Sequence, residues 1–132
     1  SEQPQWGFCT GALVGPDLIL TAGHCVDNEK ECLHTKIVFD FYLSGKNDNI
    51  KTIKSQLVYS CKEIVYRQEE LKGADFALIR IDRKITDRTY LKFSDAEVTF
   101  QDQFLIAGYP LGLPFKFTFD GGLRSNLNEK FL

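Results

Sequence analysis

The sequence predicts an all-β protein, because its apolar residues fall into short runs that are separated by turn-forming residues. One such run, residues 18–20, directly follows Gly15-Pro16-Asp17, a tripeptide that favours a tight turn. Large apolar residues recur at every second position in residues 37–43 and again in residues 115–119. Alternation with a period of two is typical of strands that bury one face.

Composition narrows the possible functions. The chain has 132 residues, the length of one domain, and 43% of them are hydrophobic, enough for a real core. Its net charge is −2 and it has no basic block, so we expect neither nucleic acid nor an anionic membrane surface as a partner. It has no run of eighteen apolar residues, so we expect no span of a bilayer. Because the chain starts at Ser1 and has no methionine, we expect a processed or trimmed product.

Strands and turns can be assigned in chain order. Residues 1–5 are expected to form a loose leader, followed by Trp6 and Phe8 as the first buried side chains. Residues 11–14 and 18–21 are expected to form a hairpin, and residues 27–31 a surface turn. The remaining expected strands are residues 36–43, 51–59, 62–66, 75–81, 98–107 and 115–119. Residues 67–72 are expected to be charged and exposed, residues 82–95 to connect two halves, and residues 45–49, 108–112 and 120–122 to form turns.

Four cysteines, Cys9, Cys25, Cys32 and Cys61, occur in this short chain. Four cysteines allow three disulfide pairings, and disulfides persist in oxidising compartments. A zinc-bound structural domain, with Cys25, Cys32, His34 and Cys61 as ligands, is the alternative. Structural zinc sites usually contain a C-x-x-C pair, which this sequence lacks, so disulfides are favoured.

Two further stretches carry candidate functional residues. His24 follows an apolar run and the small residues 21–23, so it is expected on a tight turn just past a strand end. Asp75 opens the apolar run of residues 76–79, as a carboxylate at the mouth of a buried strand would. Taken singly, the first could be a histidine beside a structural disulfide, and the second an aspartate satisfied by backbone amides.

Together, these motifs resemble the trypsin-like (chymotrypsin-fold) serine peptidases, most closely their bacterial extracellular branch. Residues 21–25, TAGHC, match the T-A-[AG]-H-C signature of the catalytic histidine, and Cys9-x-Gly11 and the apolar run of residues 18–20 precede them as in the family. Residues 75–79, DFALI, match the pattern D-[FIV]-A-L-[IL] of the catalytic aspartate, 51 positions after His24. Residues 108–112, GYPLG, match an element of the second barrel, G-[YWH]-P-x-G.

The resemblance implies a chymotrypsin-like antiparallel β-barrel fold. It places a complete first barrel in residues 1–88, a connector in residues 89–97 and the opening strands of an incomplete second barrel in residues 98–132. It also implies the disulfide Cys9–Cys25, which would leave Cys32–Cys61 as the second bridge. The implied function is that of a secreted endopeptidase, extracellular or periplasmic, which needs no cofactor or metal and cleaves protein or peptide substrates. His24 would be its general base and then acid, and Asp75 its orienting carboxylate.

The nucleophile of this family lies in a G-[DN]-S-G-[GS]-P element, and the sequence contains no such element. Ser125 is the only serine late in the chain, and it lacks the flanking glycines that shape the oxyanion hole. The apolar, glycine-rich start of cleavage-activated members is also absent. We therefore expect an inactive fragment without a nucleophile, whose second barrel is covered by a missing C-terminal half or by a partner copy. The alternative function is a non-catalytic binding module on the same fold.

Overall fold

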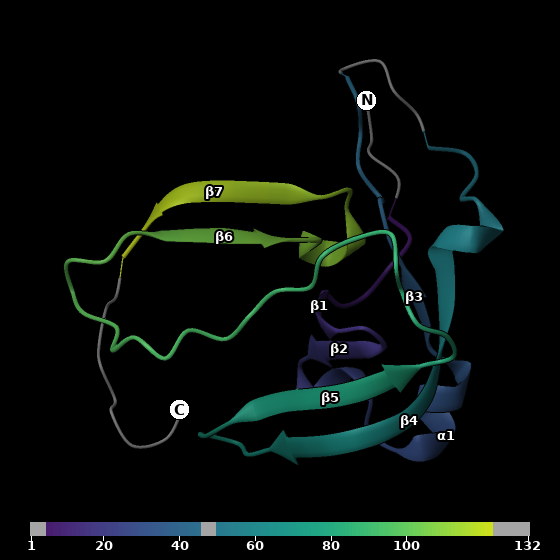
Figure 1. Cartoon of the computed structure of the whole chain (residues 1–132), viewed down its shortest axis with the longest axis horizontal. Helices are drawn as coiled ribbons and strands as arrows, with labels where there is room; N and C mark the ends of the chain where they lie inside the picture. Colours follow the sequence, from purple (N-terminus) through teal and green to yellow (C-terminus); the bar gives the residue numbers. More distant parts are fainter. Residues whose placement is uncertain (1–4, 46–49, 123–132) are drawn as a thin grey trace.

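The computed structural model describes residues 5–45 and 50–122 and confirms the all-β prediction (Figure 1). A curled five-stranded antiparallel sheet, a half-barrel, has the strand order β1-β2-β5-β4-β3, and a second sheet pairs β6 with β7 (Figure 1). The strands are β1 (Gly11–Gly15), β2 (Leu18–Thr21), β3 (Lys36–Val38), β4 (Val58–Glu69), β5 (Asp75–Ile81), β6 (Phe104–Gly108) and β7 (Lys116–Gly121).

The centre of the first sheet follows the sequence closely. The expected hairpin is β1 and β2, which pair antiparallel from Gly11 opposite Thr21 to Leu13 opposite Ile19. Strand β2 then pairs with β5. Their inward side chains build one core, because isoleucines on adjacent strands meet on the same face. The buried cluster is Leu13, Ile19, Val26, Cys32, Tyr59, Cys61, Ala77, Ile79, Ile81 and Ile85.

Residues 27–31 were expected to form a surface turn, but the structure has a helix here, α1 (Glu29–His34). Asn28 caps it, since its side-chain oxygen accepts a hydrogen bond of 3.0 Å from the backbone N–H of Glu31. Glu31 reaches back to the N–H of Asp27 at 3.3 Å, so capping starts a helix that has almost no apolar periodicity. Only Cys32 of α1 is buried.

Several expected strands have different bounds. Strand β3 ends at Val38 instead of residue 43, because Asp40 takes a left-handed backbone conformation with φ of 59°. In residues 51–59 a short helix, η2 (Ser55–Leu57), replaces the expected strand, and β4 then runs unbroken from Val58 to Glu69. The strand expected at residues 98–107 begins only at Phe104.

The expected burial of the first aromatic side chains is wrong. Trp6 is 49% exposed and Phe8 is 72% exposed. The backbone N–H of Trp6 instead donates to the carbonyl of Gly112, between β6 and β7, at 3.1 Å. Nearby, the hydroxyl of Thr10 accepts from the N–H of Tyr109 at 2.9 Å, so this segment links β1 to the second sheet.

Both expected disulfides are present: Cys9–Cys25, which the family resemblance implies, and the remaining pair, Cys32–Cys61. The second joins α1 to β4 inside the core. The four cysteine sulfurs form these two disulfide bonds, so none is a free thiolate that could bind zinc. The alternative zinc site at Cys25, Cys32, His34 and Cys61 is therefore wrong.

The second sheet has an exposed aromatic face. Phe115, Phe117 and Phe119 are 40%, 58% and 63% exposed, and consecutive rings lie 6.3 and 5.3 Å apart. The sequence predicted this alternation. The division of the chain at residues 88 and 97 remains a prediction. Within the described residues, none of the helices has the length and apolar character needed to cross a bilayer.

The bend at Asp40 should depend on Arg88, whose guanidinium donates to both Asp40 carboxylate oxygens at 2.8 and 3.0 Å. Both side chains are partly exposed, so we expect Arg88→Gln to lower the free energy of unfolding by only about 1 kcal/mol. Asparagine tolerates the left-handed backbone but has no charge, so Asp40→Asn should lower the free energy of unfolding by a similar amount. Denaturant unfolding of both variants and of the double variant measures the coupling, and strictly additive losses would contradict this ion pair.

Candidate active site

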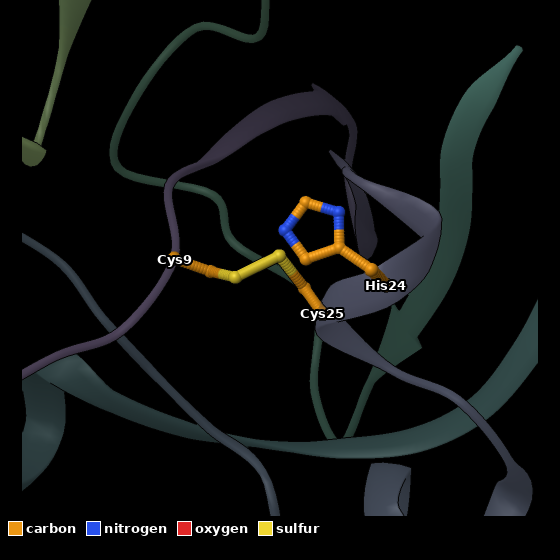
Figure 2. Close-up of side chains that lie close together, drawn as sticks. All are labelled: Cys9, His24 and Cys25. Carbon is orange, nitrogen blue, oxygen red and sulfur yellow. A yellow bond between two sulfur atoms is a disulfide. The ribbon is translucent and has the colours of Figure 1, made fainter. Parts of the chain in front are cut away.

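His24 lies in a short turn of helix, η1 (Gly23–Cys25), which begins two residues after β2 ends. The turn is closed by hydrogen bonds from the N–H groups of Cys25 to Ala22 and of Val26 to Gly23, at 3.1 and 3.3 Å. Cys25 is buried and is held to Cys9 by the disulfide that lies beside the His24 ring (Figure 2). The backbone of His24 is therefore fixed from its C-terminal side.

Asp75 is the first residue of β5 and pairs across the sheet with Glu69 of β4. Because β2 and β5 are antiparallel, the end of β2 and the start of β5 lie at the same edge of the sheet. The Asp75 carboxylate uses both oxygens on His24: Oδ2 lies 2.6 Å from the ring Nδ1, and Oδ1 accepts from the backbone N–H at 3.0 Å. The structure thus brings together the two residues that the sequence singled out.

Gly23 allows this close approach. A Cβ at this position would overlap the backbone carbonyl oxygen of Gln68 and would lie 2.9 Å from Oδ1 of Asp75. The turn can pack directly onto the backbone of β4 because position 23 carries no side chain.

The ion pair shifts both pKa values in opposite directions. The hydrogen bond to Asp75, and then its negative charge, raise the pKa of His24 above 6.5. The same hydrogen bond to the His24 ring lowers the pKa of Asp75 below 3.8. Asp75 is therefore ionised at neutral pH, and the Nδ1–H of His24 donates a hydrogen bond to its carboxylate.

This arrangement leaves Nε2 of His24 as the available base. The His24 side chain is 58% exposed, so a hydroxyl group or a substrate can reach it. Beside it, a cavity of about 600 Å³ extends into the half-barrel and is lined in part by Cys9, Cys25 and Phe41. The geometry suits a general base that removes a proton from a neighbouring nucleophile.

The same region cannot hold a metal ion as it stands. Ligand atoms of Cys9, His24 and Cys25 lie within 4.8 Å of one another, but both sulfurs belong to the disulfide (Figure 2). A disulfide sulfur is not a thiolate and does not ligate zinc as one would. Only the imidazole of this group of three remains as a ligand.

Several serines have other roles among the residues that the structure describes. The ammonium of Lys36 donates to the hydroxyl of Ser60 at 2.7 Å, and Ser94 accepts from the N–H of Ala96 at 3.2 Å. Ser55 begins η2, and Ser44 lies in a bend after β3. Ser125 lies outside the described residues.

Sequence reasoning missed Arg67, which was expected to be exposed in a charged segment. The structure places it in β4, where its side chain is 25% exposed and its Nε donates to the carbonyl of Gly23 at 2.9 Å. No local sequence pattern predicts this contact, because it joins positions that are 44 residues apart.

A comparison with protein families agrees with the all-β fold. The family model for the trypsin-like peptidase domain matches residues 9–131, nearly the whole chain. The chain belongs to the trypsin-like peptidase family.

The paired shifts predict how stability depends on pH. Because folding raises the pKa of His24, protonated His24 stabilises the folded chain. This contribution to the free energy of unfolding is fully present below about pH 6.5 and is lost as pH rises through the folded-state pKa. Because folding lowers the pKa of Asp75, its contribution is present above about pH 3.8 and is lost as pH falls through the lowered value. Denaturant unfolding between about pH 5 and 9 should show the alkaline loss.

His24→Gln should remove that alkaline loss. His34→Gln changes the only other histidine and leaves the pair intact, so it should retain the loss. An alkaline loss that persists unchanged in His24→Gln would show that the pair does not link folding to protonation.

Proposed function

We propose that this chain carries the general base and the orienting acid of a secreted serine endopeptidase, which hydrolyses peptide bonds with a Ser-His-Asp triad. The observation that carries the proposal is the double contact of Asp75 with the ring and the backbone of His24, at 2.6 and 3.0 Å. Membership of the trypsin-like peptidase family supports it.

The proposed chemistry follows from the tautomer. A serine hydroxyl attacks an amide poorly until a base takes its proton, and Nε2 of His24 can act as that base while Asp75 holds Nδ1–H. The imidazolium that forms is stabilised by the adjacent carboxylate and then gives its proton to the leaving amine. No metal or cofactor is needed for these steps.

The serine nucleophile is proposed to come from outside these 132 residues, because no serine in the sequence has the flanking glycines of the family element. The exposed ring face at Phe115, Phe117 and Phe119 supports a second barrel that further strands, or a partner copy, would cover. In this proposal, residues 1–88 form the first barrel, residues 89–97 the connector and residues 98–132 part of the second barrel.

Secretion is proposed from the cysteine chemistry. Both disulfides are compatible with an oxidising compartment, either extracellular or periplasmic. A thiol count on the protein isolated from its native source, with and without reductant, tests this assignment.

The function is tested with a fluorophosphonate probe, which phosphonylates activated serines with release of fluoride, and with a peptide ester. The 132-residue chain should show no labelling and no turnover above buffer. A longer chain that includes the residues encoded downstream should show both, and His24→Ala should reduce turnover by roughly 10⁴-fold or more, as triad substitutions do in other serine peptidases.

Two outcomes would change the conclusion. Turnover by the 132-residue chain that His24→Ala abolishes would mean that the nucleophile lies within it. A longer chain that stays inactive and unlabelled would favour the non-catalytic binding module.

A further inference from the structure

The turn that carries His24 has little internal support on its N-terminal side. The helix η1 spans three residues, and Ala22 before it offers no side-chain cap. The disulfide through Cys25 holds the C-terminal side of the turn. Within the described residues, the Gly23 carbonyl accepts from the N–H of Val26 at 3.3 Å and from the guanidinium of Arg67 at 2.9 Å.

Arg67 spans the turn. Its Nε donates to Gly23, the residue before His24, and its Nη2 donates to Asp27, three residues after His24, at 3.0 Å. The same Nη2 also contacts the carboxylate of Glu69. A planar guanidinium can make these contacts together because its donors lie in a fixed fork.

The backbone position of Arg67 connects this fork to Asp75. On the ladder between β4 and β5, Arg67 pairs with Ala77, and Glu69 pairs with Asp75. Arg67 is therefore anchored to the strand beside the one that carries the carboxylate, while its side chain holds the turn that carries the imidazole. The distance between His24 and Asp75 is set partly through this side chain.

The positive charge of Arg67 also lies close to two carboxylates that act on His24. Asp27 and Glu69 are the two acids, besides Asp75, whose negative charges act on His24 and favour its imidazolium. Arg67 contacts both of them. Without Arg67, two uncompensated carboxylates would remain close to the base.

We propose that Arg67 is a positioning residue, which clamps the turn around His24 onto β4 and keeps the imidazole aligned with Asp75. The inference rests on the proposed function, in which that alignment is needed for proton transfer. The alignment of His24 with Asp75 is a property of these 132 residues, so it can be tested separately from peptidase activity.

The test follows the Nδ1 proton of His24 by NMR in the 132-residue chain. In Arg67→Gln we expect this proton to exchange with water roughly tenfold faster, because the turn loses a charge-assisted hydrogen bond. Arg67→Lys keeps the charge but not the fork, so it should fail to restore the slow exchange. His24 should also titrate at a higher pH in Arg67→Gln, where Asp27 and Glu69 are left unpaired, than in Arg67→Lys.

Arg80→Gln is the matched control. Arg80 is 33% exposed on the neighbouring strand and also bridges two acids, Asp17 at 3.1 Å and Glu63 at 2.7 Å, but it does not contact the turn. We expect it to lower the melting temperature about as much as Arg67→Gln and to leave the exchange and titration of His24 unchanged.

The proposal is wrong if Arg67→Gln leaves both His24 readouts at their wild-type values, or if Arg80→Gln disturbs them equally. If Arg67→Gln fails to fold, Arg67→Lys decides the matter: slow, wild-type exchange there contradicts the clamp, and accelerated exchange supports it. A failure of the peptidase proposal would appear instead as an inactive longer chain whose His24 readouts still respond to Arg67.

Discussion

The antiparallel pairing of β2 with β5 is the constraint from which the site follows. Thr21 lies opposite Ala77, so the chain leaves β2 at the edge of the sheet where β5 begins. His24 is three residues beyond that pair and Asp75 is two residues before it. His24 and Asp75, which are 51 positions apart in the sequence, are thereby joined by a hydrogen bond of 2.6 Å. Any slip of this register by one residue would turn the buried Ile79 outward and separate the pair.

The turn after β2, which carries His24, is held from three directions. The disulfide Cys9–Cys25 fixes its end, the missing side chain of Gly23 lets it pack on β4, and Arg67 contacts its start. These contacts surround a ring that is itself largely exposed, so access and rigidity coexist at His24. Such support is what a proton-transfer group needs, because small displacements of the base weaken catalysis strongly.

The sequence predicted the parts of the fold that depend on local patterns. The β1–β2 hairpin and strand β5 have the expected positions because apolar periodicity and the turn at residues 15–17 define them. Strand β7 keeps the expected alternation, but it runs to Gly121, so the turn expected at residues 120–122 is wrong. Helix α1 was missed because its signal is a cap, Asn28 followed by Glu31, rather than a periodic apolar face. The early end of β3 was missed because it follows from the left-handed backbone of Asp40, whose carboxylate pairs with Arg88, 48 residues away.

The site was predicted unevenly for the same reason. His24 and Asp75 lie in short motifs that can be recognised in one sequence, and the structure places them together. Arg67 has no motif, because its role comes from the ladder between β4 and β5 and from a carbonyl 44 residues earlier. The exposure of Trp6 and Phe8 was also missed, since it depends on how the segment before β1 crosses toward Gly112.

The central claim is that this chain alone assembles His24 and Asp75 into a base with a fixed tautomer. A long-range ¹⁵N–¹H correlation spectrum of the imidazole nitrogens, recorded above the pKa of His24, tests it most directly. The structure predicts that Nδ1 of His24 carries the proton and that Nε2 is unprotonated. A spectrum in which Nε2 carries the proton, as free histidine prefers, would contradict the account.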